Sequence, residues 1–416
     1  MMTSRHDGAG RAESSESVLS ADALLRQQGV AVEPGPEAPG GRFLQSGDEA
    51  GSAPEDRAFR PDIEGLRAVA VLLVVTDHVG ISHLPAGYIG VDVFFVISGF
   101  VITGILLRER VATGRTGLMA FYGRRARRII PLAALVIVIA CIAVRILDGE
   151  RAARLVAPNA RWAALFLANI HPDLLLGTYW SLAVEEQFYL VYPALFILVA
   201  LVGSRWPVRT KLAVFLGLVV VASYLWSGIA SGGSILAPGS ALTRAWELAV
   251  GGLLALGTPL CKRLPGALAA VLTWAGLGAL VALVVGLPTT LAYPGWVAAL
   301  PVTATALIIG GGAAVPSNGA ESLLRLPPFK WLGRWSYSIY LWHLPVILLG
   351  IRYFGSDATW TRVGLAGLAV VISAGTYFGF ENPIRHSRLL TRRPPLSVGM
   401  GLITIAACLG VVTLIA

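Results

Sequence analysis

The stretch RPDIEGLRAVAVLLVVTDHVG, residues Arg60–Gly80, joins a polar helix start to an apolar run that carries titratable side chains. Arg67 and His78 are eleven positions apart, and eleven helical steps return to within about 20° of the starting direction after a rise of roughly 16 Å. Both side chains therefore share one face of the predicted helix. In a hydrocarbon layer roughly 30 Å thick, Arg67 lies near the entering end and His78 about halfway to two-thirds across.

Two carboxylates accompany these residues in the same segment. Glu64 lies on nearly the same face, and Asp77 lies about a quarter-turn aside. A charged side chain at the centre of a bilayer costs about 2.5–3.5 kcal/mol on insertion scales. A titratable cluster in a first transmembrane helix therefore indicates a functional site.

The composition is that of a polytopic membrane protein, with 55% hydrophobic and only 14% charged residues among 416 and a mean hydropathy of +0.70. The net charge of +9 does not indicate nucleic-acid binding, because the basic residues occupy short gaps between apolar runs rather than one soluble face. Cys141, Cys261 and Cys408 lie in apolar segments without metal-ligand spacing, so we predict packing residues, no disulfide framework and no metal.

The apolar segments predict an all-α, polytopic helical membrane fold with about eleven transmembrane helices. Each segment has about 17–25 residues, which is enough to span a bilayer. We expect the spans at residues 64–82, 88–107, 129–147, 181–203, 211–230, 243–260, 267–287, 296–314, 335–352, 362–381 and 397–416. Residues 1–58 lack apolar periodicity and are predicted to form a disordered tail.

The basic residues predict how the helices are oriented. Lys and Arg are concentrated in alternate gaps, within residues 108–128, 205–211, 262–263, 325–334 and 385–393. The positive-inside rule therefore places the N-terminal tail in the cytoplasm and Ala416 outside. In the outer stretch Asp148–Tyr179, the apolar piece Trp162–Ile170 is too short to cross and is expected to be re-entrant or interfacial.

Further acids are predicted close to His78. Asp92 belongs to GYIGVDVFFVISGF, and Glu185 and Glu186 belong to WSLAVEEQFY. A buried histidine is often structural, and these acids could serve only to cap a helix or to pair with Arg67 or Arg244. A neutral imidazole beside a carboxylate, however, can take a proton from a hydroxyl. Because several unpartnered acids are costly in a membrane, we expect these groups to meet in one polar cavity.

A second cluster is FYGRRARRIIP, predicted as a cytoplasmic loop that runs into the third helix. Its guanidinium groups offer forked donors that match phosphate oxygens, although charge alone favours ordinary positive-inside anchoring. The four arginines are Arg124, Arg125, Arg127 and Arg128.

A third group of residues lies near the C-terminal end of the chain. GRWSYSIYLWHLP contains Tyr337, Tyr340 and His343, which either pack or line the same cavity, and ENPIR contains Glu381, a partner for Arg385 or the arginine cluster. In RAWE, Arg244 and Glu247 are three positions apart and predict an ion pair on one helix face.

Seven blocks in order resemble the membrane acyltransferase-3 family, which contains O-acetyltransferases of bacterial envelope glycans and antibiotic-acylating relatives. They are RPDIEGLRAVAVLLVVTDHVG, GYIGVDVFFVISGF, FYGRRARRIIP, TYWSLAVEEQFYL, RAWELAVGGLLA, SYSIYLWHLP and ENPIRHS, and they cover Arg60 to Ser387. The resemblance implies a ten-helix acyltransferase domain over residues 59–387, followed by a linker and an additional transmembrane helix over residues 388–416.

The resemblance also implies the chemistry. The donor would be an acyl-CoA, usually acetyl-CoA, reached from the cytoplasm, and the acceptor would be a hydroxyl, often of a sugar near the outer face. The family's Arg and His of the first helix match Arg67 and His78, and its acid of the fourth helix matches Glu185 or Glu186. Its RxxR pattern matches Arg124 with Arg127 and Arg125 with Arg128.

The sequence leads to one main hypothesis and two alternatives. We expect a membrane O-acyltransferase in which His78, oriented by Asp77 or a fourth-helix glutamate, is the general base, and the arginine cluster anchors the donor phosphates. The same buried charges could line the path of a glycan or lipid-linked sugar transporter, or the acceptor could be a small molecule such as a macrolide. Many envelope members continue into an extracytoplasmic hydrolase-like domain, so this chain acts without one, passes the acyl group to a separate partner, or is truncated.

Overall fold

The structure is a computed structural model that describes residues 60–171, 174–203, 205–230, 239–288 and 290–416. All of them lie in the second of the chain's two units, Phe59–Ala416. The predicted disordered tail, residues 1–58, falls outside the described residues. Every regular element within them is helical, which confirms the all-α prediction.

The helices follow one another with short connections. Their bounds are α2 (Pro61–Val79), η2 (Gly87–Ile89), α3 (Gly90–Thr113), α4 (Leu118–Ala164), α5 (Tyr179–Leu201), α6 (Val208–Ala230), α7 (Ala241–Cys261), α8 (Gly266–Gly286), α9 (Ala299–Gly312), α10 (Glu321–Leu324), α11 (Pro327–Phe354), α12 (Thr359–Thr376), η3 (Tyr377–Glu381), α13 (Asn382–Arg385), α14 (Arg388–Arg392) and α15 (Pro394–Ile415). Seven helical segments of the described chain are long and apolar enough to cross a membrane. The protein is therefore a multi-pass membrane protein, and the count of eleven spans stays a prediction.

Helix α2 begins and ends with the expected signals. Arg60 is extended, Pro61 occupies the first turn, and Gly80 ends the helix in the left-handed conformation with φ of 73°. The Arg60 side chain pairs with Asp62 and also donates to the Ile309 carbonyl (3.1 Å), which attaches the start of α2 to α9. Gly80 is favoured there because it adopts a positive φ without steric strain.

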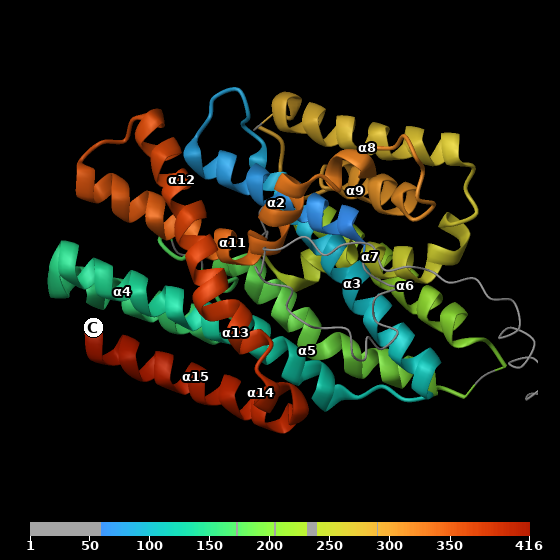
Figure 1. The fold of residues 1–416 in the computed structure, drawn as a ribbon, viewed down its shortest axis with the longest axis horizontal. Coiled ribbons are helices and arrows are strands. Elements are labelled where there is room, and N and C mark those ends of the chain that lie inside the picture. The colour runs from blue at the N-terminus through green and yellow to red at the C-terminus, as the bar shows by residue number, and fades with distance from the viewer. Residues whose placement is uncertain (1–59, 172–173, 204, 231–238, 289) are drawn as a thin grey trace, which may run out of the picture. The chain divides into compact units, whose positions relative to one another are not determined.

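Glycines allow the central helices to cross closely. A Cβ atom at Gly99 of α3 would lie 1.8 Å from the Leu248 carbonyl oxygen, and one at Gly251 of α7 would lie 2.0 Å from that of Val96. Where α11 crosses α2, a Cβ atom at Gly333 of α11 would lie 1.8 Å from the Glu64 carbonyl oxygen. Figure 1 shows α2 and α3 near the middle, with α11 and α12 on one side and α6 to α9 on the other.

Helix α4 consists of two arms joined at Gly149, where φ is 82°. The second arm returns alongside the first, because Ala164 and Phe166 line a small cavity together with Ala133 and Ala134. Gln187 of α5 then donates to the Phe166 carbonyl at 3.0 Å. The chain around Trp162–Ile170 therefore packs against α4 and α5, and its expected re-entrant or interfacial position stays a prediction.

The arginine cluster corrects one expectation. FYGRRARRIIP was predicted as a loop, but α4 already begins at Leu118, so all four arginines lie on its first turns. The physical reason is that apolar residues recur at helical spacing here, with Phe121, Ile129 and Leu132 all buried.

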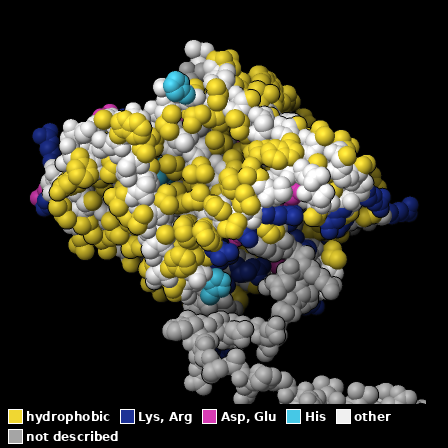
Figure 2. All heavy atoms as spheres, turned by 45° about the horizontal axis from the view of Figure 1, so that its top comes forward, with side chains coloured by type: hydrophobic (Ala, Val, Ile, Leu, Met, Phe, Trp, Pro, Cys, Tyr) yellow, Lys and Arg dark blue, Asp and Glu magenta, His cyan; other side chains and the backbone are white. Residues whose placement is uncertain are grey.

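The surface is that of a membrane-embedded helical domain. Helix α6 exposes a row of large apolar side chains, including Leu218, Val221 and Leu225. In Figure 2, hydrophobic side chains are spread over the visible face, and Lys and Arg lie mainly across its lower part and at its left and right ends. Contact with hydrocarbon accounts for this pattern, because water would oppose so large an exposed apolar area.

Candidate functional site

Two cavities lie along α2, where the sequence had predicted one. The first, called the Arg cavity, has a volume of about 90 Å³ and is lined mainly by Arg67, Ser98, Arg125, Arg128, Glu185, Tyr189, Ser336, Tyr337 and Tyr340. The second, called the His cavity, has a volume of about 340 Å³ and is lined by Val74, Asp77, His78, Tyr88, Val91, Gly177, Thr178, Trp180, Arg244, Leu291, Tyr293 and Tyr340. Val91 and Tyr340 line both, so they form the wall between the two cavities.

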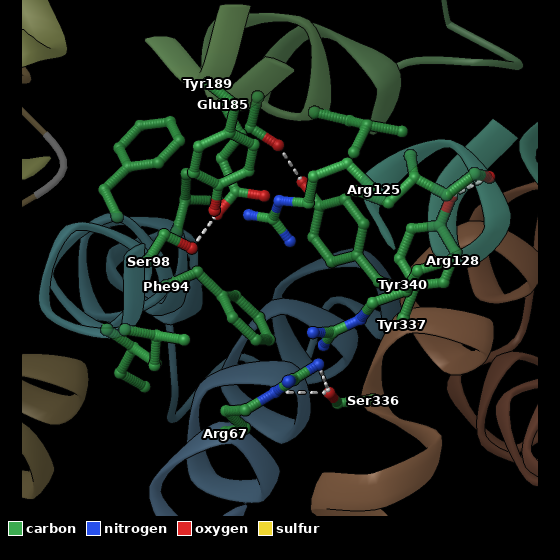
Figure 3. Close-up of a pocket in the computed structure, with 17 residues that line it drawn as sticks. Arg67, Phe94, Ser98, Arg125, Arg128, Glu185, Tyr189, Ser336, Tyr337 and Tyr340 are labelled. Carbon is green, nitrogen blue, oxygen red and sulfur yellow. Dashed lines mark hydrogen bonds between the residues drawn. The ribbon is translucent and has the colours of Figure 1, made fainter. Parts of the chain in front are cut away.

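Three guanidinium groups face the Arg cavity. Figure 3 shows Arg67 and Arg128 side by side, with Arg125 across the space next to Glu185 and Tyr189. Nε and Nη2 of Arg67 both donate to the Ser336 hydroxyl, at 3.1 and 2.8 Å, which directs this guanidinium toward the cavity. Such a concentration of forked donors suits an anionic group such as a phosphate.

The remaining charges of this cavity come from α4 and α5. Arg125 lies over the ring of Tyr189 at 3.6 Å, and its buried Nε has no hydrogen-bond partner among the described residues. Glu185 accepts a hydrogen bond from Ser98. Oε1 of Glu186 is buried nearby without a hydrogen-bond partner among the described residues. The cavity lining therefore holds three cations and one carboxylate, an excess of positive charge.

The structure gives the four clustered arginines three different roles. Arg125 and Arg128, three positions apart, line the Arg cavity. Arg124 is exposed and pairs with Glu109 at 3.5 Å. Arg127 donates to the Leu390 carbonyl at 3.1 Å and to the Ser397 hydroxyl at 2.9 Å, so it fastens α4 to the chain at α14 and α15.

The hydrogen bonds of His78 determine which of its nitrogens carries a proton. Its Nδ1 is 2.9 Å from the Val74 carbonyl oxygen and 3.4 Å from Nε2 of the fully buried His343, whose Nδ1 is 3.0 Å from the Ile339 oxygen. A carbonyl oxygen can only accept, so both Nδ1 atoms carry hydrogen, and Nε2 of His343 accepts from His78. His78 lines the His cavity, and in its neutral form the ring is thereby left with a free lone pair on Nε2.

The partners of His78 differ from those expected. The hydrogen bonds that orient its ring come from Val74 and His343, rather than from Asp77 or a glutamate of α5. Asp77 lines the His cavity beside it. Glu185 instead lies in the Arg cavity, beyond the shared wall.

A buried ionic network lies beneath the His cavity. Nη1 of Arg244 donates to Asp92 and to Glu247, both at 2.9 Å, which confirms the predicted ion pair in RAWE. Tyr293, in the connection between α8 and α9, donates its hydroxyl to Asp92 at 2.5 Å. Burial and the adjacent negative charge of Asp92 raise the pKa of the Tyr293 phenol, so it stays protonated and keeps donating.

The remaining predicted residues occupy supporting positions. Tyr337 lines the Arg cavity and donates to the Ile129 carbonyl at 2.7 Å. Glu381 is buried behind it and accepts from Ser338 at 2.7 Å. Sequence reasoning missed Ser98, Ser336 and Trp180, because serine and aromatic residues are common in apolar helices and carry no signal of their own.

Comparisons with known proteins show which family the chain resembles. The family model described as an acyltransferase domain matches residues 60–378. The chain is 32% identical to YrhL of Bacillus subtilis, whose name describes a candidate peptidoglycan O-acetyltransferase, over 79% of this chain and 55% of that protein. It is 30% identical to the peptidoglycan O-acetyltransferase OatA of Listeria monocytogenes, over 80% of this chain and 56% of that protein.

A third relative is the O-acetyltransferase OatA of Staphylococcus aureus, 28% identical over 79% of this chain and 57% of that protein. The chain thus spans only somewhat more than half the length of these curated relatives. No solved structure matches the chain. The match over residues 60–378, together with these relatives, shows that the chain belongs to the membrane acyltransferase-3 family.

Proposed function

We propose that this protein is a membrane O-acyltransferase that moves an acyl group, with acetyl as the first choice, from a cytoplasmic acyl-CoA to a hydroxyl of a cell-envelope carbohydrate. The names of the relatives favour peptidoglycan as that carbohydrate. The observation that carries the proposal is the contact of two unlike cavities at Tyr340, one rich in guanidinium groups and one containing a histidine with a free nitrogen.

The Arg cavity supports a donor that carries phosphates. Arg125 and Arg128 offer the donors that phosphate oxygens accept, and Arg67 adds a third positive charge. The rise from Arg67 to His78 is roughly 16 Å along α2. The extended arm of coenzyme A joins its phosphates to its thioester, so in this proposal it reaches from one cavity to the other when the Tyr340 side chain in the shared wall moves aside. In this proposal the Arg-cavity end of α2 faces the cytoplasm.

The His cavity supports base catalysis on an acceptor hydroxyl. Nε2 of His78 takes the hydroxyl proton while the hydroxyl oxygen attacks the thioester carbonyl carbon. The carbon–sulfur bond then breaks, and the imidazolium returns the proton to the departing thiolate. The products are an ester and free coenzyme A, and His78 regains its neutral form.

His343 acts in this scheme as a positioning residue. It accepts from Nδ1 of His78 and is itself held by the Ile339 carbonyl. This arrangement keeps the free lone pair on Nε2 of His78 and stabilises the positive charge that develops on the ring.

The test is acetyl transfer by the full chain reconstituted in liposomes, with radiolabelled acetyl-CoA and peptidoglycan fragments as acceptor. We expect His78→Ala to lower label transfer by about 100-fold or more, because a positioned general base contributes roughly 10²–10⁴-fold. His83→Ala is the matched control, since His83 is exposed in the loop after α2. Full activity of the His78 variant would show that the base is elsewhere, and no transfer by the wild type would disprove the acyltransferase proposal.

The same assay tests His343. His343→Ala should lower kcat by roughly tenfold or more while leaving the KM for acetyl-CoA within about twofold, because it removes part of the base's contribution. His343→Gln offers an amide oxygen as acceptor and should restore part of the rate. If the two variants lose equal activity and equal thermal stability, His343 has only a packing role.

A further inference from the structure

The His cavity has a wall of aromatic rings. Trp180, Tyr88, Tyr293 and Tyr340 line it together with the catalytic candidate His78. Its volume of about 340 Å³ falls within the roughly 300–1,000 Å³ of small-molecule sites. This volume is larger than one attacking hydroxyl group would need.

The aromatic wall is fixed from below by buried charge. The Arg244 guanidinium lies 5.5 Å from the ring centres of both Trp180 and Tyr293, and Asp92 and Glu247 hold it in place. Tyr88 contacts Tyr293 edge to face, with ring centres 4.6 Å apart. Three rings of the wall are therefore held rigidly before any ligand arrives, which lowers the entropic cost of binding.

One polar atom at this cavity lacks a partner. The Thr178 hydroxyl is buried, the residue is only 2% exposed, and it has no hydrogen-bond partner among the described residues. An unsatisfied buried hydroxyl costs about 1–3 kcal/mol. The Thr178 oxygen is covered in the present rotamer, so a rotation about the Cα–Cβ bond is needed to turn it to a ligand, and the bond it then makes removes that cost. The Asp77 carboxylate, which also lines the cavity, is a second group that can accept from a ligand hydroxyl.

Taken together, these features specify a ligand with apolar ring faces and several hydroxyls. We infer that the His cavity is a carbohydrate subsite, in which a sugar ring packs its C–H face on Trp180 and bonds through its hydroxyls to Thr178 and Asp77. This inference rests on the proposed function, since one further hydroxyl meets Nε2 of His78 and becomes the acyl acceptor. The sugar enters at the end of α2 beyond His78, where Leu291 is exposed at the rim.

Binding is measured first, without any need for catalysis. The probe is the disaccharide N-acetylglucosaminyl-N-acetylmuramic acid, titrated against full-length His78→Ala protein in lipid nanodiscs by saturation-transfer NMR. In this background Trp180→Ala should raise Kd by about tenfold, the upper range for one aromatic contact, and Thr178→Val should raise it by roughly threefold to tenfold. Trp360→Ala is the matched control, because Trp360 is 84% exposed on α12.

Trp180→Phe guards against misfolding, since it keeps a ring on Arg244, and its Kd should fall between those of the wild-type residue and Trp180→Ala. With an active His78, the Trp180 and Thr178 variants should raise the KM for the disaccharide more than the KM for acetyl-CoA. Unchanged disaccharide binding in the Trp180→Ala and Thr178→Val proteins would overturn the subsite. Binding of a macrolide that depends on Trp180, without binding of the disaccharide, would overturn it as well. Disaccharide binding that depends on Trp180, without any acetyl transfer by the wild type, would instead reject the proposed function and keep the subsite.

Discussion

At the residue scale, helix geometry decides which charged side chains can meet a ligand. Arg125 and Arg128 are separated by three positions and face the Arg cavity, whereas Arg124 and Arg127 point to the surface and to α15. Four adjacent arginines thus perform three different tasks. Net charge alone would have assigned the same task to all four arginines.

The first prediction follows from this division. Replacing Arg125 and Arg128 together by Gln should raise the Kd for acetyl-CoA by roughly 100-fold or more, because hydrogen bonds to charged groups contribute about 1.5–3 kcal/mol each and two such groups are removed. Equilibrium binding of labelled acetyl-CoA to the protein in nanodiscs measures the effect. Arg124→Gln should leave Kd unchanged, since Arg124 pairs with Glu109 at the exposed surface. An equal loss of acetyl-CoA affinity in the double variant and in Arg124→Gln would mean that the cluster acts only through general charge.

At the scale of elements, the site depends on how closely the helices approach one another. Gly99 and Gly251 let α3 and α7 touch through their backbones, which brings Asp92 of one helix to Arg244 of the other. Burying an ion pair is costly unless its geometry is good. The close crossing is therefore what makes the network under the His cavity possible.

The second prediction concerns this crossing. Gly251→Ala would place a methyl group 2.0 Å from the Val96 carbonyl oxygen, and the backbone must move to admit it. We expect a loss of about 1–3 kcal/mol in stability, as for other overpacked interiors. Thermal inactivation of the detergent-solubilised protein measures it. Gly257→Ala, on the same helix but with nothing within 4 Å of its new methyl group, should be neutral or stabilising.

At the scale of the whole molecule, α15 shows how a segment beyond the matched residues joins the domain. The family model ends at residue 378, yet α15 packs along α4 through Arg127–Ser397 and a contact of Cys408 with the Ala134 carbonyl at 3.9 Å. Arg127, which belongs to the family-like arginine pattern, therefore bonds to a helix outside the family model.

The third prediction concerns orientation in the membrane, which the distribution of Lys and Arg predicts. In a protein whose three native cysteines are replaced by serine, Arg115→Cys should be protected from a membrane-impermeant maleimide added to intact cells, and Arg151→Cys should be labelled. Both positions are exposed, so protection reports the side of the membrane. The reverse pattern would place the Arg cavity at the outer face and exclude a cytoplasmic donor.

The sequence predicted the elements well and the site in part. Helix period placed Arg67 and His78 on one interior face, and both line cavities beside α2. It predicted the Arg244–Glu247 pair, because three helical positions bring side chains together. The sequence-based prediction failed where the answer depended on distant segments. The structure has two cavities where one was expected, and the ring that bonds to His78 is the imidazole of a residue 265 positions away.

By itself, the sequence determined the all-helical, membrane-embedded class of the protein and the spacing of functional groups within each helix. Both follow from local rules, the apolar length of a span and 3.6 residues per turn. Only the tertiary structure decided that Tyr340 separates an arginine-lined cavity from a histidine-lined one, and that Thr178 and Trp180 complete the latter. These features arise from close packing between helices remote in sequence, where no local pattern specifies which side chains meet.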